Sequence, residues 1–585
     1  MAFADPRDGD IEDDASSTSR HSLLAHAGTM LLDTSLPKLA IALVQALVVP
    51  GLVLGAAPVV ALWFLQQVWW RLPGEANAAW LSVFLAVDAW LVWRFGPRLF
   101  RMVERAFWSL NAGLVQPLFM AVREAVRQLL ERRLARREAG AEALAKRRVT
   151  AGLVAGGLIA AVGALTAYAV GPLPRWFSPV LGVEDLPLFL RDALANGVWA
   201  VSAYLAVAAP AWSLGEAIAG SPRDLPPAPE GEAEWRVAHL SDIHLVGEEY
   251  GFRLECGRDG PRGNWRFEAA LRALEEADAR ARLDLVLITG DVTDAGRNAE
   301  FIAFADAMRA HPSLAARTLI LPGNHDLNIV DRASPARLEL PTSPGPWIRR
   351  LRMLAATAAL QGGRVRVMAP GRRAVGPTLD EFLAQDGRSA SMAAFLDDGR
   401  VPRGQPRPRD VWEACFPMVV PPASPDGCGV LLLDSNALTH FSFTNALGIL
   451  AAAEWHAAEH AMAEWPRARW LVCLHHHLVE YPKAGVKLAD RIATALTNGH
   501  WVIARLRRQA ARLVVLHGHR HTDWTGEVGG VRILSAPSPV MGDADLASPR
   551  YFWIQRFARG EGDALAVLAA ERIDVACQPG APAAE

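Results

Sequence analysis

Long apolar runs ahead of residue 220 constrain the fold of this chain more than any other feature of its sequence. The first run covers 27 residues and carries Gln45 as its only strongly polar side chain. A helix that crosses a bilayer needs only about 20 apolar residues. The four runs lie at residues 39–65, 76–93, 149–170 and 193–214. We therefore expect an all-α transmembrane domain of about four helices over residues 38–220.

Composition supports this division and excludes some classes of protein. Hydrophobic residues make up 51% of the chain and the mean hydropathy is +0.13, which is high for a soluble enzyme. The net charge of -2 and the absence of a nucleic-acid-binding motif give no evident nucleic acid partner. The five cysteines lie far apart without a CxxC pair, which argues against both a disulfide framework and a zinc ribbon and favours a reducing compartment.

The charge of the loops predicts how the chain crosses the membrane. Residues 94–148 hold 13 Lys and Arg residues, whereas the loop at 66–77 holds one and the loop at 171–192 holds two. The positive-inside rule puts the basic loop in the cytoplasm, and four spans then leave both termini there. In one alternative, residues 107–122 dip into the membrane interface, and an extra span there would overturn this topology.

Small residues in the third run allow two interpretations. Gly152 and Gly156 are four residues apart, a spacing that lets two transmembrane helices approach closely. Filling of the run with small, flexible residues explains the same spacing equally well.

Polar segments mark the ends of the folded domains. Residues 1–37 begin with an acidic stretch that lacks the basic start and early apolar run of a secretory signal, so we expect a disordered cytosolic tail. Residues 221–234, SPRDLPPAPEGEAE, are rich in Pro and acidic residues, as linkers are. We place a catalytic domain at 235–575 and a flexible tail at 576–585.

Short apolar runs alternate with helical patterns after residue 235. The predicted strands are WRVAHL, LDLVLI, RTLILP, GVLLLD, RWLVCL, RLVVLH and VRILSA. The predicted helices lie at residues 266–281, 298–310, 448–465 and 490–509, where apolar residues recur every three or four positions. This alternation predicts a mixed α/β domain. Residues 331–428 interrupt the rhythm, and we interpret them as a long insertion that forms a lid or cap.

Polar clusters follow five of the predicted strands, where open α/β sheets tend to bind ligands. They are Ser241-Asp242-Ile243-His244, Gly290-Asp291-Val292-Thr293-Asp294, Gly323-Asn324-His325-Asp326, His475-His476-His477 and His517-Gly518-His519-Arg520-His521. Any one of them alone is a weak signal, because an isolated Asp or His is more often part of a surface turn. Five in order along the chain predict a metal-dependent site.

Taken together, DxH, GDxxD, GNHD, a His after a strand and GHxH resemble the calcineurin-like metallophosphoesterase family over nearly all of residues 235–545. The resemblance implies that family's fold, a four-layer αββα sandwich of two β-sheets between helices. It also implies hydrolysis of a phosphomonoester or phosphodiester by metal-activated water, with two divalent metal ions. Asp, His and Asn ligands suit Mn, Fe or Zn, so the sequence does not choose among these metals.

The resemblance also implies which residues would hold the metals. Asp291 would bridge both ions, because a carboxylate can give one oxygen to each. The first ion would also be held by Asp242, His244 and His521. The second ion would also be held by Asn324, His475 and His519. His475 is assigned because it directly follows its strand, as in similar family members, and a neighbouring His stays an alternative.

Two further residues would act outside the metal shell. His325 follows Asn324 directly and cannot easily reach the same metal. The family's role for this position fits it: a donor to the phosphoryl oxygens, or the acid that protonates the leaving group. Asp294 would orient His325, since an Asp-His pair fixes the tautomer of an imidazole. The alternative for Asp294 is an N-cap of the following helix.

The substrate stays open among several classes. Pro322 stands where Ser/Thr protein phosphatases similar to calcineurin usually carry Arg, which disfavours protein dephosphorylation. GNHD and GHRH resemble the bacterial class III cyclic-nucleotide phosphodiesterase branch. The transmembrane domain favours a rival substrate, a lipid phosphate or lipid-linked diphosphate. A non-catalytic membrane sensor or scaffold is a further alternative. Such a protein would lack one or more metal ligands, but all of them are present in this sequence.

These features predict an integral membrane enzyme of the bacterial inner (plasma) membrane whose catalytic domain is cytoplasmic. Its partners would be a phosphoester substrate and the lipid bilayer. The sequence does not predict an oligomeric state.

Overall fold

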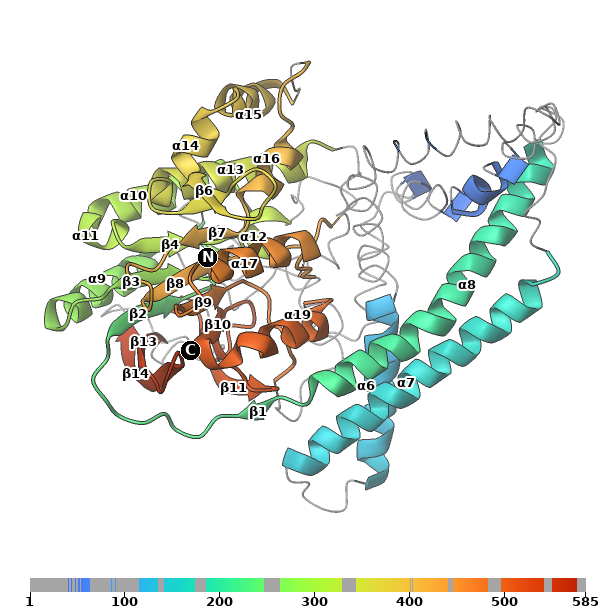
Figure 1. Ribbon diagram of the computed structural model, residues 1–585, viewed down its shortest axis with the longest axis horizontal. Coiled ribbons are helices and arrows are strands. Elements are labelled where there is room, and N and C mark those ends of the chain that lie inside the picture. The colour runs from blue at the N-terminus through green and yellow to red at the C-terminus, as the bar shows by residue number, and fades with distance from the viewer. Residues whose placement is uncertain are drawn as a thin grey trace, which may run out of the picture. The chain divides into compact units, whose positions relative to one another are not determined.

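The protein divides into a helical unit and a unit built on two β-sheets (Figure 1). The helical unit is Ser35–Ile218, and the sheet unit contains Ala219–Glu585. This computed structural model describes residues 115–134, 141–173, 186–246, 264–328, 343–399, 401, 403–439, 446–481, 496–540 and 550–575, with isolated stretches between 40 and 90. The predicted tails at 1–37 and 576–585 lie outside the described residues.

The described part of the helical unit consists mainly of long helices. They are α6 (Gln116–Leu134), α7 (Ala141–Val170) and α8 (Leu186–Ala219). Most of α7, from Lys146, and the whole of α8 are long and apolar enough to cross a membrane by length and composition. The third and fourth predicted runs fall within these two helices. The first two runs are described only in isolated stretches, and part of the basic loop lies outside the described residues.

Glycines let α7 approach α8 closely. A Cβ at Gly156 would lie 2.5 Å from the Ser213 Oγ, and a Cβ at Gly163 would lie 2.7 Å from the Ser202 carbonyl oxygen. A Cβ at Gly152, the other half of the predicted pair, would meet no atom closer than 3.7 Å. The tight contact therefore uses glycines seven residues apart, which share one face of a helix.

Two neighbouring glycines test this contact. A Cβ at Gly157 would meet nothing within 4 Å, so Gly157→Leu is a matched control for Gly156→Leu. We expect Gly156→Leu to lower the melting temperature of the detergent-solubilised protein, because overpacking costs about 1–3 kcal/mol. The measurement is differential scanning fluorimetry of both variants. Equal melting temperatures would contradict a close approach of the two helices.

The sheet unit holds two mixed sheets whose central strands are parallel. The strands are β1 (Arg223–Asp224), β2 (Trp235–Leu240), β3 (Leu285–Ile288), β4 (Thr318–Ile320), β5 (Arg366–Met368), β6 (Val375–Thr378), β7 (Met418–Val420), β8 (Cys428–Leu432), β9 (Arg469–Cys473), β10 (Leu513–His517), β11 (Trp524–Val528), β12 (Val531–Ser535), β13 (Arg550–Arg559) and β14 (Leu565–Val575). One sheet has the order β14-β13-β2-β3-β4 and the other β1-β11-β12-β10-β9-β8-β7-β5-β6. All seven predicted strands are confirmed.

Helices of this unit connect the strands. They are α9 (Trp265–Arg280), α10 (Asn298–Ala310), α11 (Pro312–Ala315), α12 (Asn324–Leu327), α13 (Gly345–Gln361), α14 (Leu379–Ala384), α15 (Arg388–Asp398), α16 (Pro408–Cys415), α17 (Ala452–Glu464), α19 (Gly499–Leu506) and the 3-10 helix η7 (Arg507–Arg512). The first two predicted helices are confirmed as α9 and α10. The third begins later than predicted, at Ala452. In the fourth, the described residues 496–498 are not helical and α19 begins at Gly499.

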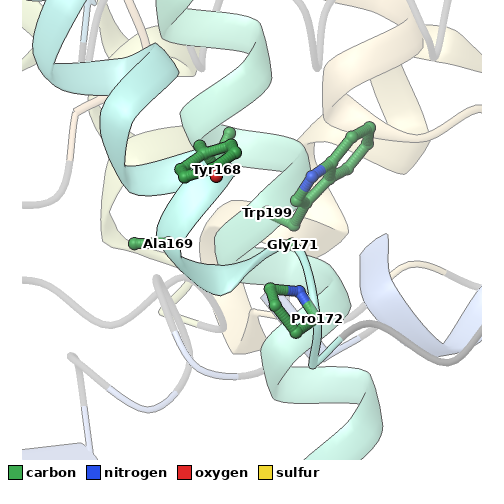
Figure 2. A pocket seen from close by; sticks show the side chains of 6 residues that line it. Tyr168, Ala169, Gly171, Pro172 and Trp199 are labelled. Carbon is green, nitrogen blue, oxygen red and sulfur yellow. The ribbon is translucent and has the colours of Figure 1, made fainter.

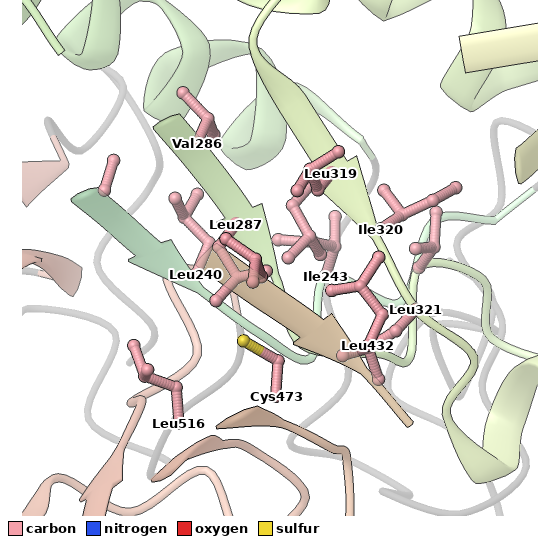
Figure 3. Packing of buried hydrophobic residues seen from close by; sticks show 14 of the residues in the cluster. Leu240, Ile243, Val286, Leu287, Leu319, Ile320, Leu321, Leu432, Cys473 and Leu516 are labelled. Carbon is pink, nitrogen blue, oxygen red and sulfur yellow. The ribbon is translucent and has the colours of Figure 1, made fainter. Parts of the chain in front are cut away.

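Alternate residues of the central strands enter two different cores. In β10, Val514 belongs to the core that also contains Leu240 of β2 and Leu432 of β8, so this core joins both sheets (Figure 3). The next residue, Val515, packs instead with the apolar residues of α17 and α19 on the outer face of the nine-stranded sheet. Burial of both faces explains why the strand sequences are apolar throughout. The predicted mixed α/β class is confirmed.

The described part of the predicted insertion, from residue 343, extends the fold. Strands β5, β6 and β7 lengthen the nine-stranded sheet at one end. Helix α13 lies beside β4, where the Gln361 side chain accepts a hydrogen bond from the Ile320 N–H (2.7 Å) and donates one to the Ile320 carbonyl (3.0 Å). These described residues are therefore part of the sheet unit, and the lid or cap predicted for residues 331–428 stays a prediction.

The segment predicted to be a linker also differs from expectation. Arg223–Asp224 forms β1, which pairs antiparallel with β11 at the edge of the nine-stranded sheet. The first strand of the unit therefore lies inside residues 221–234. The polar sequence did not predict this strand, because main-chain pairing does not depend on apolar side chains.

A pocket of the helical unit lies where α7 ends (Figure 2). It is lined by Ala167, Tyr168, Ala169, Gly171, Pro172 and Trp199. The lining includes no acidic or basic side chain and none of the predicted site residues, so this pocket does not suit metal chemistry.

Candidate metal centre

Loops at the carboxyl ends of parallel strands carry all the predicted metal ligands. Asp242 and His244 follow β2, Asp291 follows β3 and Asn324 follows β4. The other three, His475, His519 and His521, follow β9 and β10 of the second sheet. The structure brings these residues from two sheets into contact, although up to 279 positions separate them along the chain.

Most of these residues hold a strained backbone. Five have a positive φ: Asp242 (56°), His244 (50°), Asp291 (51°), His519 (75°) and His521 (47°). Such a conformation costs a non-glycine residue about 1–3 kcal/mol and persists only where the surrounding structure fixes it. Strain that gathers on one set of polar residues indicates a functional site.

The first group consists of Asp242, His244 and His521. The Nε2 atoms of His244 and His521 are 3.2 Å apart, and the His521 Nε2 lies 3.4 Å from the Asp242 Oδ1. The His244 Nε2 lies 4.0 Å from the same oxygen. Asp242 and His244 are buried, and His521 is partly exposed. These three side chains could hold one metal ion.

The second group consists of Asp291, Asn324, His475 and His519. The His475 Nε2 lies 3.0 Å from the Asn324 Oδ1, 3.2 Å from the Asp291 Oδ2 and 3.2 Å from the His519 Nδ1. The His519 Nδ1 lies 2.9 Å from the Asn324 Oδ1. Asp291, His475 and His519 could hold a second metal ion, and the amide oxygen of Asn324 points at the same place.

Asp291 lies between the two groups. Its Oδ2 is 3.8 Å from the His244 Nε2 of the first group and 3.2 Å from the His475 Nε2 of the second. Burial alone would raise the pKa of the Asp291 carboxyl, but the neighbouring His475 and His325 outweigh burial and lower that pKa. Asp291 in turn raises the pKa of His475 against the effect of burial. The Asp291 carboxylate is therefore ionised, and it favours a positively charged group beside it.

The donor atoms of both groups fit divalent cations. In the second group, contacts of 2.9–3.2 Å connect four nitrogen and oxygen atoms, and a single proton cannot satisfy them all. The Nδ1 of His475 is 2.8 Å from the Thr289 carbonyl, to which it donates, so the neutral imidazole, the form that binds a metal, has its lone pair on Nε2, facing the group. Carboxylate, imidazole and amide donors in this arrangement suit Mn, Fe or Zn.

His325 is held by the main chain of Asp294. Its Nδ1 donates a hydrogen bond of 2.7 Å to the Asp294 carbonyl, whereas the Asp294 carboxylate Oδ1 lies 3.8 Å away. The same Oδ1 is 3.6 Å from the His244 Nδ1. The rings of His244 and His325 meet edge to face at 4.4 Å. The Asp294 carboxylate thus lies between His244, a predicted metal ligand, and His325. Its Oδ1 is at a similar distance from both rings, so it can orient either of them.

Residues 236–414 match the family described as calcineurin-like phosphoesterase. The chain carries a calcineurin-like phosphoesterase domain. The match covers the clusters from Asp242 to His325, and the clusters at His475 and His519 lie beyond it. This match supports a metal-dependent phosphoesterase.

Comparison with known proteins gives low similarities beyond the family match. A dimetal phosphatase from Danio rerio is 11% identical, with 59% of this chain and 100% of that chain covered and a TM-score of 0.34. The putative 5'-nucleotidase from Staphylococcus aureus is 12% identical (59% and 55% covered, TM-score 0.29). A calcineurin-like phosphoesterase from Bacillus subtilis is 10% identical (59% and 91% covered, TM-score 0.24). No curated protein matches the chain.

The three consecutive histidines of the phosphoesterase domain have different surroundings. His475 is in the second group, whereas the Nδ1 of His476 is paired with the Ser435 Oγ at 2.9 Å. His477 stacks on His519 with ring centroids 5.6 Å apart. Burial lowers the pKa of both His476 and His477 well below the usual value, so both are neutral. Of the three, only His475 has a nitrogen among the grouped donor atoms of the described residues.

Several residues that hold the loops of the domain were not predicted from the sequence. The Asp326 carboxylate accepts hydrogen bonds from the Thr293 N–H (2.8 Å), the Thr293 hydroxyl (2.7 Å) and the Gly323 N–H (2.8 Å), which ties two ligand loops together. The Ser435 Oγ accepts hydrogen bonds from the N–H groups of His475 and His476. The sequence signals Asp326 only through its position inside GNHD and does not signal Ser435. Both residues bind mostly main-chain N–H groups, which leave no pattern in a sequence.

Proposed function

We propose that the chain is a membrane-anchored phosphoesterase that binds two divalent metal ions and hydrolyses a phosphomonoester or phosphodiester with an activated water molecule. The observation that carries this proposal is the position of the Asp291 carboxylate within 3.2–3.8 Å of nitrogens from both groups. A carboxylate in this place suits a bridging ligand. Asp242, His244 and His521 would complete one metal site, and Asn324, His475 and His519 the other.

The residues around the two groups then have separate tasks. Two divalent ions bound there supply neutralisation of the phosphate charge and acidify a water molecule. His325 would donate to a phosphoryl oxygen or protonate the leaving group. Because its Nδ1 is engaged by the Asp294 carbonyl, a proton exchanged with the substrate has to pass through Nε2. Asp294 would hold His325 through its main chain and orient His244 through its carboxylate.

The membrane-anchored arrangement rests on the helical unit. The Arg148 Nη2, in α7, lies 3.1 Å from the Glu216 Oε1 near the end of α8, and the Arg123 guanidinium in α6 also donates to Glu216. Arg123 and Arg148 therefore lie at the same end of the helical unit as the C-terminal end of α8. Under the positive-inside rule this end faces the cytoplasm. This orientation supports our proposal that the catalytic domain is cytoplasmic, at a bacterial inner membrane.

Hydrolysis by the metal-loaded protein tests the proposed activity. We expect the purified full chain with Mn²⁺ to hydrolyse bis-p-nitrophenyl phosphate, and Asp291→Ala to lower kcat/KM more than about a hundredfold, because even residues outside the ligand shell typically change activity about 10–100-fold. Asp306→Ala, which alters an exposed carboxylate of α10, is the matched control. An unchanged rate in Asp291→Ala would reject the two-metal assignment. Metal binding without any hydrolysis would favour the sensor or scaffold alternative.

The class of substrate has two candidates. The GNHD and GHRH patterns favour a cyclic nucleotide, and the apolar helices α7 and α8 favour a lipid phosphate or lipid-linked diphosphate. Exposed apolar side chains such as Leu158, Val162 and Leu165 on α7 could hold the domain next to a lipid substrate.

A substrate panel separates these candidates. We expect the full chain to hydrolyse cyclic AMP at a higher kcat/KM than a lipid phosphate presented in detergent micelles, if the cyclic-nucleotide branch describes its chemistry. Phosphate release is measured under identical metal concentrations, with bis-p-nitrophenyl phosphate as the reference substrate. A preference for the micellar substrate would reject the cyclic-nucleotide assignment and support the lipid one.

A further inference from the structure

The segment between α8 and β2 lies along both sheets. Its first half pairs with β11: Arg223 is opposite Glu527, Asp224 is opposite Gly526, and the Leu225 N–H donates to the Thr525 carbonyl at 3.2 Å. The Arg223 Nε also donates to the Glu527 Oε1 at 2.7 Å. This half of the segment is thus an edge strand of the nine-stranded sheet.

The second half of the segment contacts the other sheet. The Pro229 carbonyl accepts a hydrogen bond of 2.9 Å from the Ala569 N–H of β14. The Glu234 N–H donates to the Phe557 carbonyl of β13 at 2.9 Å. Glu230 is exposed and pairs with Arg556 at 3.3 Å. Residues 223–234, which we call the strap, therefore connect the edges of both sheets.

One side chain of the strap reaches a buried tryptophan. The Trp524 Nε1 donates a hydrogen bond of 2.8 Å to the Asp224 Oδ1. Trp524 is only 4% exposed, and its indole ring lies over Gly526, where a Cβ would be 2.0 Å from the Trp524 Cζ2. Asp224 itself is on the surface. Its carboxylate thus holds the outer end of a side chain that otherwise packs inside the domain.

Trp524 begins β11 three residues after His521, a predicted metal ligand. Its ring contacts the Tyr481 ring at a centroid distance of 4.9 Å, and the Tyr481 hydroxyl is paired with the Ser535 Oγ at 2.8 Å. The Ser535 Oγ donates at 2.7 Å to the carbonyl of Thr522, the residue after His521. A chain of direct contacts therefore leads from the strap to the metal-binding turn.

The turn itself needs support from outside. His519 and His521 both have a positive φ, which costs free energy unless neighbouring contacts over-determine the conformation. His521 is also partly exposed, unlike Asp242 and His244 in the same group. Pairing of β11 with the strap supplies an anchor immediately after this turn.

We propose that the strap positions the His519–His521 turn for metal binding, and that Asp224 is the positioning residue at its centre. Asp224 fixes Trp524, Trp524 fixes the start of β11, and the start of β11 sets the geometry of the turn. The inference rests on the proposed function, because it takes His519 and His521 to be metal ligands. It also means that the segment leaving α8 is connected to the metal site by more than a flexible tether.

The test compares Asp224→Ala with Glu230→Ala in the full chain. Both changes remove an exposed carboxylate from the strap, but Glu230 contacts Arg556 of β13, in the other sheet. We expect Asp224→Ala to weaken Mn²⁺ binding to the metal-free protein by about threefold to tenfold, since residues behind metal ligands typically change affinity by about 10–100-fold. Hydrogen exchange of residues 518–528 should quicken in the same variant. Glu230→Ala should change neither quantity.

Two further variants separate positioning from folding. Asp224→Asn keeps an oxygen that can accept from Trp524, so we expect it to restore Mn²⁺ affinity. Trp524→Phe keeps an aromatic ring but removes the donor, so we expect it to weaken binding as Asp224→Ala does. An equal effect of Asp224→Asn and Asp224→Ala would overturn the role of this hydrogen bond. Melting temperatures of all variants, measured without metal, exclude general unfolding as the cause of an affinity change.

His521→Ala distinguishes failure of this inference from failure of the proposed function. If His521→Ala leaves Mn²⁺ binding unchanged, the metal assignment fails. If His521→Ala weakens Mn²⁺ binding while Asp224→Ala changes neither that affinity nor the exchange of residues 518–528, the strap inference alone is overturned.

Discussion

The burial of two carboxylates, Asp242 and Asp291, is the constraint on which the rest of the sheet unit depends. An ionised carboxylate inside a protein is costly unless cations and hydrogen-bond donors surround it. The His519 N–H donates to Asp242, and the His325 N–H donates to Asp291 at 2.8 Å. The remaining charge is met by imidazoles that point at the same oxygens. Loops from two sheets must therefore meet at one place, which the face-to-face packing of the sheets allows.

Strain at the ligand loops is offset by the contacts that lie behind them. Left-handed residues persist where the surroundings leave no alternative, and here the surroundings are mostly polar. Asp326 binds two loops to each other, Ser435 receives the N–H groups of the histidine turn, and the Ser538 hydroxyl donates to the Asp242 carbonyl at 2.7 Å. The apolar cores fix the strands, whereas these short polar contacts fix the loops that carry the predicted metal ligands. The two tasks use different residues.

The parts predictable from the sequence were those with a pattern of their own. The seven central strands are apolar on both faces, and five of them are followed directly by the clusters of predicted ligands. Strands and clusters could therefore both be recognised in the amino-acid sequence. Strand β1 was missed because a two-residue edge strand has no periodicity and pairs through its main chain. The role of Asp326 was invisible because its partners are mainly N–H groups. The contact at Gly163 was missed because a sequence does not show which face of a helix meets its neighbour.

Gln361 has a consequence for the behaviour of many copies of this chain. Strand β4 is the last strand of the five-stranded sheet, and Gln361 bonds to both main-chain groups of Ile320 in it. Arg364 adds hydrogen bonds to the carbonyls of Ala315 and Thr318. A bare edge strand is a template on which strands of other molecules can add. Because its own side chains occupy these main-chain groups, the β4 edge offers fewer free donors and acceptors to a strand from another molecule.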